Sequence, residues 1–184
     1  MYKIQRRPPK INEKVKVMVV EDNDKTAATE VELLSKLGFE PVRVADGSKA
    51  FEEMKILKPD ILVLDLELPG KTGDQILEQI LQDSELKNVP VIACSVHLQE
   101  SVDPENLGNK FTRVFHKYTG AAPEMGVSKG GEKGSEASSI KDLIVEVTLA
   151  CGEIFGGLPR ALFDYWKKSS PYKMPPYGIL EEKV

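Results

Sequence analysis

Cysteine is scarce in this sequence, which holds two cysteines, Cys94 and Cys151, far apart along the chain. A small domain held together by disulfide bonds carries a denser set of cysteines than this. The two thiols are therefore expected to be reduced, as is typical of a cytoplasmic protein. Because Cys94 lies within an apolar run, we predict that it is a small core residue.

Long apolar runs and a strong charge of one sign are also missing. No apolar run approaches the ~18 residues that indicate a membrane-spanning helix. Residues 1–14 are basic but lack the apolar segment of a secretory signal, so they are predicted to be a basic flexible arm. The formal net charge of −4 gives no general attraction to nucleic acid. We therefore expect neither a membrane span nor a nucleic-acid partner.

The sequence does contain a series of short apolar runs separated by amphipathic segments. The runs have the length and composition of buried or half-buried strands. They cover residues 15–20, 39–44, 59–68, 89–96 and 111–117. The second run alternates and contains Pro41, and the fifth is more polar than the others. Both are therefore predicted to be edge strands.

The segments between these runs carry apolar residues at helical spacing. The first helix has its apolar stripe from Ala27 to Leu37 and is expected to end at Gly38. Three more helices are predicted over residues 48–58, 73–88 and 140–155. Ser48 is the expected N-cap of the first of these three. Residues 97–110 are only weakly helical, because a proline and a glycine interrupt them.

The alternation of strands and helices indicates an α/β protein with helices on both faces of a parallel sheet. Right-handed crossovers, together with the two polar edge strands, favour the strand order 2-1-3-4-5. The predicted fold is therefore a flavodoxin-like, doubly wound, five-stranded parallel sheet. In sheets of this kind the working groups lie at the carboxyl ends of the strands, near the point where the strand order reverses.

Chemically active side chains lie at the ends of four of the predicted strands. They are Glu21 and Asp22 at the end of the first, Asp65 at the third, Ser95 at the fourth and Lys117 at the fifth. Three clustered carboxylates repel one another unless a cation lies among them. Mg²⁺ prefers such oxygen ligands, often together with a phosphate. Carboxylates also form phosphoryl intermediates, which makes Asp65 a candidate nucleophile.

From about Lys14 to Lys117 the chain resembles the receiver domain of two-component response regulators. The resemblance is carried by these five residues in this order and spacing, and by the loop "DLELPGKTG" with its Leu68-Pro69 and Gly73. It implies the receiver fold. It also implies a phosphoacceptor rather than an enzyme, with at most slow self-phosphorylation and dephosphorylation.

The resemblance further implies a role for each residue of the set. A histidine kinase or phosphotransfer protein would donate a phosphoryl group to Asp65 in a Mg²⁺-dependent reaction. The metal would be held by Glu21, Asp22, Asp65 and the backbone carbonyl of Glu67. Ser95 and Lys117 would bind the phosphoryl group and shift the face made by the fourth helix, fifth strand and fifth helix. A downstream protein would bind that face. Receivers commonly pair through the same face, so the resemblance also allows a homodimer.

Several residues near the predicted site depart from the family's pattern. Val96 stands where a smaller residue is usual, so we expect slow phosphoryl transfer and slow hydrolysis. Tyr118 stands where a proline with a cis bond is usual, and such a bond before a non-proline costs about 3 kcal/mol. The switch aromatic's usual place on the fifth strand holds Val114. The candidate modulators of the site are Glu67, Val96, His97, Val114 and Phe115.

The remaining segments complete the expected organisation. The receiver domain is predicted over 15–156, with a Gly/Ser-rich insertion at 118–139 before the last helix. Residues 157–184 form a C-terminal extension that is too short for a DNA-binding output domain. Within it, Leu158, Leu162, Phe163 and Trp166 are spaced for one side of a short helix. That helix either covers the protein's own core or docks on a partner.

These observations leave three functions to compare. The first is a stand-alone receiver that is phosphorylated on Asp65 and signals through protein contacts. The second is a receiver-like scaffold that acts without phosphorylation, which the departures at Val96 and Tyr118 favour. The third is a phosphohydrolase that uses Asp65 as nucleophile and Glu67 as acid. It ranks last because "DLELP" lacks the Asp-x-Asp pattern of such enzymes.

Overall fold

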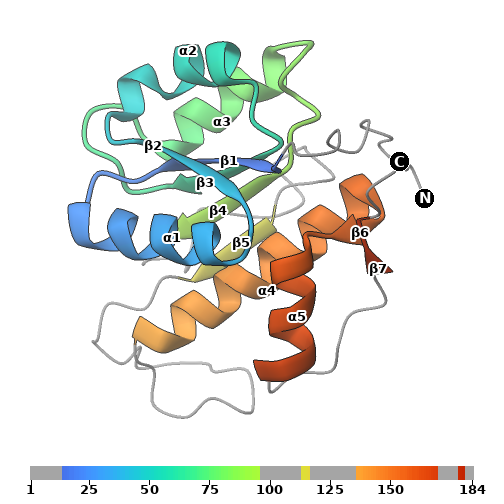
Figure 1. The fold of residues 1–184 in the computed structure, drawn as a ribbon. Coiled ribbons are helices and arrows are strands. Elements are labelled where there is room, and N and C mark those ends of the chain that lie inside the picture. Colours follow the sequence, from blue (N-terminus) through green and yellow to red (C-terminus); the bar gives the residue numbers. More distant parts are fainter. Residues whose placement is uncertain (1–13, 96–112, 117–135, 170–177, 181–184) are drawn as a thin grey trace.

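The computed structural model describes residues 14–95, 113–116, 136–169 and 178–180 (Figure 1). Its strands are β1 (Lys16–Val20), β2 (Glu40–Val44), β3 (Ile61–Asp65), β4 (Val91–Ser95), β5 (Arg113–His116), β6 (Gly157–Leu158) and β7 (Gly178–Ile179). Its helices are α1 (Asp24–Lys36), α2 (Gly47–Leu57), α3 (Gly73–Gln82), α4 (Glu136–Phe155) and α5 (Arg160–Ser169).

Strands β1 to β5 form one parallel sheet in the order β2-β1-β3-β4-β5, which confirms the predicted topology. Helices α2 and α3 cover one face of this sheet, and α1 and α4 cover the other (Figure 1). All five residues of the central strand β3 are buried, whereas β2 is largely half-exposed. The apolar run of β3 and the mixed composition of β2 therefore reflect a central and an edge position.

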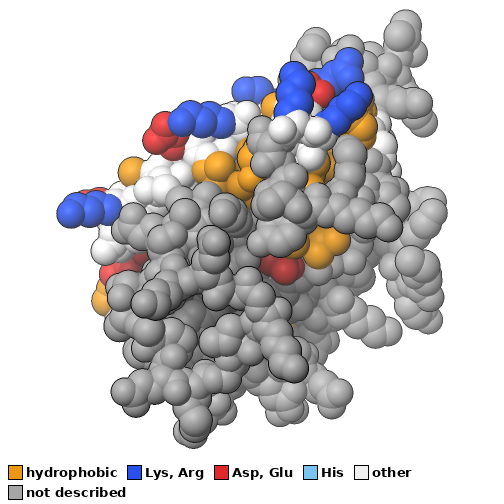
Figure 2. Space-filling model, turned by 90° about the horizontal axis from the view of Figure 1, so that it is seen from below, with side chains coloured by type: hydrophobic (Ala, Val, Ile, Leu, Met, Phe, Trp, Pro, Cys, Tyr) orange, Lys and Arg blue, Asp and Glu red, His pale blue; other side chains and the backbone are white. Residues whose placement is uncertain are grey.

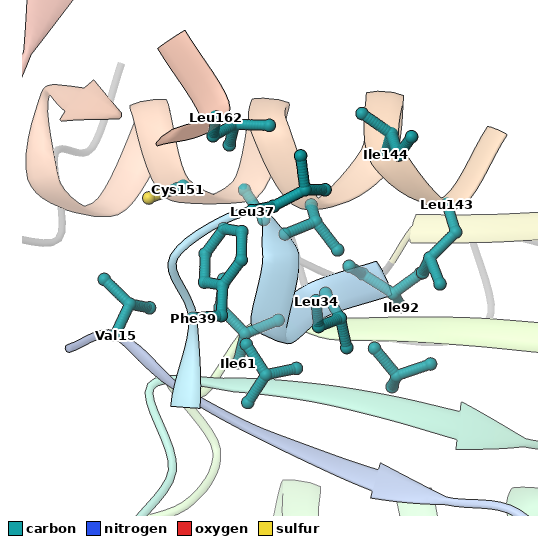
Figure 3. Packing of buried hydrophobic residues seen from close by; sticks show 14 of the residues in the cluster. Val15, Leu34, Leu37, Phe39, Ile61, Ile92, Leu143, Ile144, Cys151 and Leu162 are labelled. Atoms are coloured by element: carbon teal, nitrogen blue, oxygen red, sulfur yellow. The ribbon is translucent and has the colours of Figure 1, made fainter. Parts of the chain in front are cut away.

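Each face of the sheet has its own hydrophobic core. Alternate residues of β1 divide between the two: Val17 and Val19 face α1 and α4, and Met18 and Val20 face α2 and α3. On the α1 and α4 side, Leu34 and Phe39 pack near Ile61 beneath α4 (Figure 3). Cys94 and Cys151 are both free thiols buried in this same core. The prediction that Cys94 is a core residue is confirmed.

Burial raises the pKa of the Cys151 thiol well above its ordinary value, and the charge of Asp60 adds to the shift. The thiol is therefore neutral in the folded protein and serves as a small apolar side chain.

Three predicted helix boundaries differ from those observed. The N-cap of α2 is Asp46 rather than Ser48, whose hydroxyl and backbone N–H both donate to Asp46 Oδ1, at 2.6 and 2.9 Å. These two hydrogen bonds lower the pKa of Asp46. The helix predicted over 73–88 ends at Gln82, because Asp83 turns the chain with its side chain. The last helix begins at Glu136, inside the insertion predicted over 118–139.

Gly38 follows α1 with a φ of +90°, a conformation that favours glycine, so the predicted stop of the first helix is confirmed. A Cβ atom at this position would lie 3.4 Å from the Ala161 side chain. The loop after α1 therefore also contacts the C-terminal extension. Residues 1–13 and the segment 97–110, which was predicted to be weakly helical, lie outside the described residues.

The C-terminal extension packs against the core on the α1 and α4 side of the sheet. Leu158, Leu162 and Trp166 are buried, with 0, 0 and 7% of their surfaces exposed, in the core shared by α1 and α4. Strands β6 and β7 pair in parallel, and the Leu180 N–H donates to the Leu158 carbonyl at 2.8 Å. Of the two roles considered for this segment, the structure shows the cover over the protein's own core.

A buried hydrogen bond fixes α5 to α4. The indole N–H of Trp166 donates to Thr148 Oγ1 at 2.8 Å, and the Thr148 hydroxyl donates to the Ile144 carbonyl at 2.6 Å. Lys167 and Lys168, in the last turn of α5, are exposed. Figure 2 shows the molecule from below, and on the described part of this surface basic side chains lie next to apolar ones.

Candidate functional site

Three carboxylates meet where β1 and β3 end. In the parallel register Val20 pairs with Leu64, so Glu21 and Asp65 leave the sheet side by side, and Asp22 follows directly. One oxygen from each of Glu21, Asp22 and Asp65 lies within 4.8 Å of the others. The structure therefore brings together the three acids that the sequence predicted to converge.

The three acids differ in their surroundings. Glu21 and Asp65 are buried, with 2 and 7% of their surfaces exposed, whereas Asp22 is exposed. The Asn23 N–H donates to Glu21 Oε1 at 3.2 Å, and the Glu67 N–H donates to Asp65 Oδ1 at 2.9 Å. These two hydrogen bonds fix the orientation of the Glu21 and Asp65 carboxylates.

The loop that carries Glu21 and Asp22 is fixed on both sides. Asn23 is the N-cap of α1, because its Oδ1 accepts from the Lys25 and Thr26 N–H groups at 3.0 and 3.1 Å. Arg43, from β2, reaches the same loop and donates to the carbonyls of Glu21 and Asp22. Sequence patterns did not predict either contact, because the reach of a side chain from a neighbouring strand leaves no periodic signal.

The loop after Asp65 is anchored by close backbone packing. The Leu66 N–H donates to the Cys94 carbonyl, and the Gly73 N–H donates to the Leu66 carbonyl at 3.1 Å. A Cβ atom on Gly73 would lie 2.4 Å from the Asp65 carbonyl oxygen and 2.6 Å from Leu66 Cα, so α3 can begin this close only with glycine. Leu68 turns back into the core, where 5% of it is exposed.

The other predicted site residues are placed to different extents. Ser95 ends β4 next to His116 on β5, in the same register that pairs Asp65 with Cys94. The Glu67 side chain is exposed and does not belong to the acidic cluster. Val114 and Phe115 lie on the edge strand β5, of which only the backbone is described. Val96, His97, Lys117 and Tyr118 lie outside the described residues.

The donor set suits a hard divalent cation. Carboxylate oxygens are the ligands that Mg²⁺ and Mn²⁺ accept, and Mg²⁺ binds through one or two carboxylates while it keeps several waters. With two buried carboxylates and one exposed carboxylate, the cluster concentrates negative charge at an edge that solvent reaches. The residues present therefore fit a metal of this class.

A doubly wound parallel sheet with an acidic cluster at its switch point defines a class of α/β proteins that bind ligands at the carboxyl ends of their strands. The model of the response regulator receiver domain matches residues 17–121, more than half of the chain. The chain therefore belongs to the response regulator receiver domain family, whose members act in two-component signal transduction.

Curated relatives give the same assignment. The chain is 33% identical over 107 residues to the hybrid signal transduction histidine kinase D of Dictyostelium discoideum, which is 58% of this chain and 7% of that protein. It is 32% identical over 77 residues to the polar-differentiation response regulator DivK of Brucella anthropi, or 42% of this chain and 63% of DivK. The matched segments thus span less than two thirds of either relative.

Solved structures share the fold. The phosphorylated cyanobacterial phytochrome response regulator RcpA is 28% identical, with a TM-score of 0.51 over 58% of this chain and 83% of its own. The receiver domain of a LuxO repressor protein from Vibrio parahaemolyticus is 17% identical, with a TM-score of 0.55 over 75% of this chain and 93% of its own. Among the described helices, none combines the length and the apolar character needed to cross a membrane.

Proposed function

We propose that this chain is a receiver that accepts a phosphoryl group on Asp65 and passes the signal on through protein contacts. The observation that carries the proposal is the convergence of Glu21, Asp22 and Asp65 within 4.8 Å at the carboxyl edge of a receiver sheet. Membership of the receiver family and similarity to RcpA, a phosphorylated response regulator, support it.

The chemistry is the transfer of a phosphoryl group to a carboxylate. A carboxylate oxygen of Asp65 attacks phosphorus, the bond from phosphorus to the donor's nitrogen or oxygen breaks, and an acyl phosphate forms. Asp65 is buried, and the Glu67 N–H holds its Oδ1, so its orientation is set before the reaction. The phosphoryl group arrives with negative charge at a cluster that is already negative, and this repulsion must be offset.

Mg²⁺ would supply that offset, with Glu21, Asp22, Asp65 and the backbone carbonyl of Glu67 as its proposed protein ligands. Ser95 and Lys117 are the proposed partners of the phosphoryl oxygens. Ser95 ends β4, one strand beyond Asp65, which is consistent with this role. The protein supplies positioning and charge, so we expect a phosphoacceptor that turns over slowly rather than an enzyme.

The proposed partners follow from the same chemistry. A histidine kinase or a phosphotransfer protein would supply the phosphoryl group, and a downstream protein would bind the phosphorylated form. We place this exchange in the cytoplasm, where the two buried free thiols, Cys94 and Cys151, would stay reduced.

A second function is favoured by two positions in the sequence. Val96 and Tyr118 stand where the family's pattern has a small residue and a proline, next to the proposed phosphoryl partners Ser95 and Lys117. A scaffold that binds its partner without phosphorylation would tolerate both substitutions. The retention of all five acceptor-site residues favours the phosphorylated receiver over this alternative.

The test is incubation of the full chain with Mg²⁺ and a small phospho-donor such as acetyl phosphate, followed by intact mass measurement. We expect a gain of one phosphoryl group that is stable in acid and labile in base. The gain should depend on Mg²⁺ and disappear in Asp65→Asn.

Glu67→Gln is the matched control, because it removes a nearby exposed carboxylate outside the acidic cluster. This variant should still gain the phosphoryl group. Absence of both the adduct and Mg²⁺ binding in the wild type would favour the scaffold. Rapid multiple turnover of the donor would instead favour a phosphohydrolase.

A further inference from the structure

Arg43 makes three contacts with the loop that carries two of the site's acids. Its Nε donates to the Glu21 carbonyl at 3.1 Å, and its Nη2 donates to the Asp22 carbonyl at 3.0 Å. Its Nη1 forms an ion pair with Asp24 Oδ1 at 2.7 Å. One guanidinium group thus contacts three of the four residues from Glu21 to Asp24, which is the first residue of α1.

The sheet explains how Arg43 reaches this loop. Arg43 lies on β2 in register with Val19 of β1, and Val19 faces α1 and α4, so the arginine side chain lies on the same side as α1. Its neighbour Val44 packs into the core on the opposite face. Because α1 begins directly after β1, an arginine at this position of the edge strand is next to the loop between them.

The arginine is only partly accessible, with 27% of its side chain exposed, whereas 90% of the Asp24 side chain is exposed. The bond to the Glu21 carbonyl is partly buried, whereas the bond to the Asp22 carbonyl is exposed, as the ion pair is. A planar guanidinium can hold two carbonyls in a fixed relation, which a lysine ammonium cannot reproduce. The contacts with the backbone define the position from which the Glu21 and Asp22 side chains extend.

We propose that Arg43 is a positioning residue for the acidic cluster, which holds the β1–α1 loop so that the Glu21 and Asp22 carboxylates stay close to Asp65 and bind a divalent cation. This inference rests on the proposed function, in which the cluster binds Mg²⁺. Without the clamp, mutual repulsion of the three carboxylates is free to displace the loop from Asp65.

The sign of the effect separates positioning from simple electrostatics. Arg43 is a positive charge close to a cation site, so its charge alone opposes Mg²⁺ binding. If charge were its only influence, Arg43→Gln would tighten Mg²⁺ binding, and Arg43→Lys would leave it unchanged. If Arg43 positions the loop, both variants weaken binding. Residues that orient metal ligands typically change metal affinity by about 10- to 100-fold when they are substituted.

The experiment is a titration of the full chain with Mg²⁺ alone, followed by calorimetry, for the wild type, Arg43→Gln and Arg43→Lys. Asp24→Asn is the matched control, because it removes only the exposed ion pair, which contributes little. Hydrogen exchange at the amides of Asn23, Lys25 and Thr26 is measured in parallel without metal, since side-chain acceptors on this loop bind these three amides.

We expect at least about 10-fold weaker Mg²⁺ binding and faster exchange of the loop amides in both Arg43 variants, and little change in Asp24→Asn. Unchanged or tighter binding with unchanged exchange in the Arg43 variants would overturn the positioning role and leave the proposed function standing. A wild type that does not bind Mg²⁺ would overturn the proposed function. In that case faster exchange in the Arg43 variants would still support the clamp on the loop, and unchanged exchange would overturn it.

Discussion

At the scale of single residues, Gly73 is the position where the geometry around Asp65 tolerates least change. A Cβ atom there would lie 2.4 Å from the Asp65 carbonyl oxygen, a backbone atom that cannot move without shifting the end of β3. We expect Gly73→Ala to destabilise the protein by about 3 kcal/mol, at the upper end of the usual cost of overpacking. The measurement is the free energy of unfolding in urea.

Gly178→Ala is the control for this substitution. Gly178 lies on the exposed strand β7, and an added Cβ would have no atom within 4 Å. The free energy of unfolding of this variant should lie within about 0.5 kcal/mol of the wild-type value, as is usual for surface substitutions. Equal stability of the two variants would contradict the close packing at Gly73.

The residue types at the strand ends predicted that Glu21, Asp22 and Asp65 belong to the site, because the carboxyl ends of parallel strands lie at one edge of the sheet. Their convergence could be predicted in this way, whereas the contacts that fix them could not. For Arg43 the sequence predicted only that it is a polar residue on an alternating edge strand. Its role depends on the register of β2 against β1 and on the reach of a long side chain, neither of which is encoded in local periodicity.

At the scale of elements, the turn after α3 depends on an ionised Asp83. Its Oδ1 accepts from the Glu85 and Leu86 N–H groups at 2.8 and 3.1 Å, and Lys55 Nζ lies 3.3 Å from its Oδ2. The two backbone N–H groups, with a smaller contribution from Lys55, lower the pKa of Asp83 below its ordinary value. The apolar stripe alone would extend the helix to residue 88, and this side-chain capping of the turn ends it at Gln82.

A lowered pKa has a defined consequence for stability. The charged form is favoured in the folded state, so the stabilisation is present above the unfolded pKa of about 4 and is lost as the pH falls through the lower folded value. We expect Asp83→Asn to be less stable than the wild type at pH 7, and the two stabilities to converge below about pH 4. The free energies of unfolding of both proteins, measured from pH 7 to pH 2, check this prediction. A difference between them that stays constant down to pH 2 would contradict it.

The packing of α5 on α4 depends on one buried hydroxyl. Thr148 is fully buried and accepts the Trp166 indole N–H at 2.8 Å. Thr148→Val keeps the shape but removes this acceptor, so we expect a loss of about 1–3 kcal/mol in the free energy of unfolding.

In a Trp166→Phe background, Thr148→Val should lower the free energy of unfolding much less, because the indole N–H donor is already absent. Denaturant unfolding of the four variants in this cycle gives the coupling energy directly. Additive effects of the two substitutions would show that the hydrogen bond does not stabilise this contact.

At the scale of the whole molecule, the C-terminal extension belongs to the folded core. A chain ended at Gly156 would lose the buried side chains of Leu158, Leu162 and Trp166 and expose the core beneath α4. Each such side chain contributes about 1.5–3 kcal/mol, so the loss should reach about 5 kcal/mol, comparable with the total stability of a small domain. Thermal unfolding followed by circular dichroism should show a much lower midpoint temperature for the shortened chain than for the full chain. An unchanged transition would contradict the packing seen here.

The arrangement of the sheet was predictable because strand composition distinguishes central from edge positions and crossovers have one hand. The position of the extension was not, because an amphipathic helix such as Arg160–Ser169 fits its own core or a partner equally well. Only the matching of Trp166 to Thr148 and of Ala161 to Gly38 decides between them. Contacts so distant in sequence depend on the assembled fold.

The central claim, that Asp65 is the phosphoacceptor, is tested most directly by locating the adduct. After incubation with Mg²⁺ and acetyl phosphate, borohydride reduces an acyl phosphate to an alcohol and so converts a phosphorylated aspartate into homoserine. Peptide sequencing by mass spectrometry then identifies the converted residue. We predict homoserine at position 65 of the wild type and none in the sample without phospho-donor. An unconverted Asp65 in a chain that carries the phosphoryl group elsewhere, or carries none, would contradict the account.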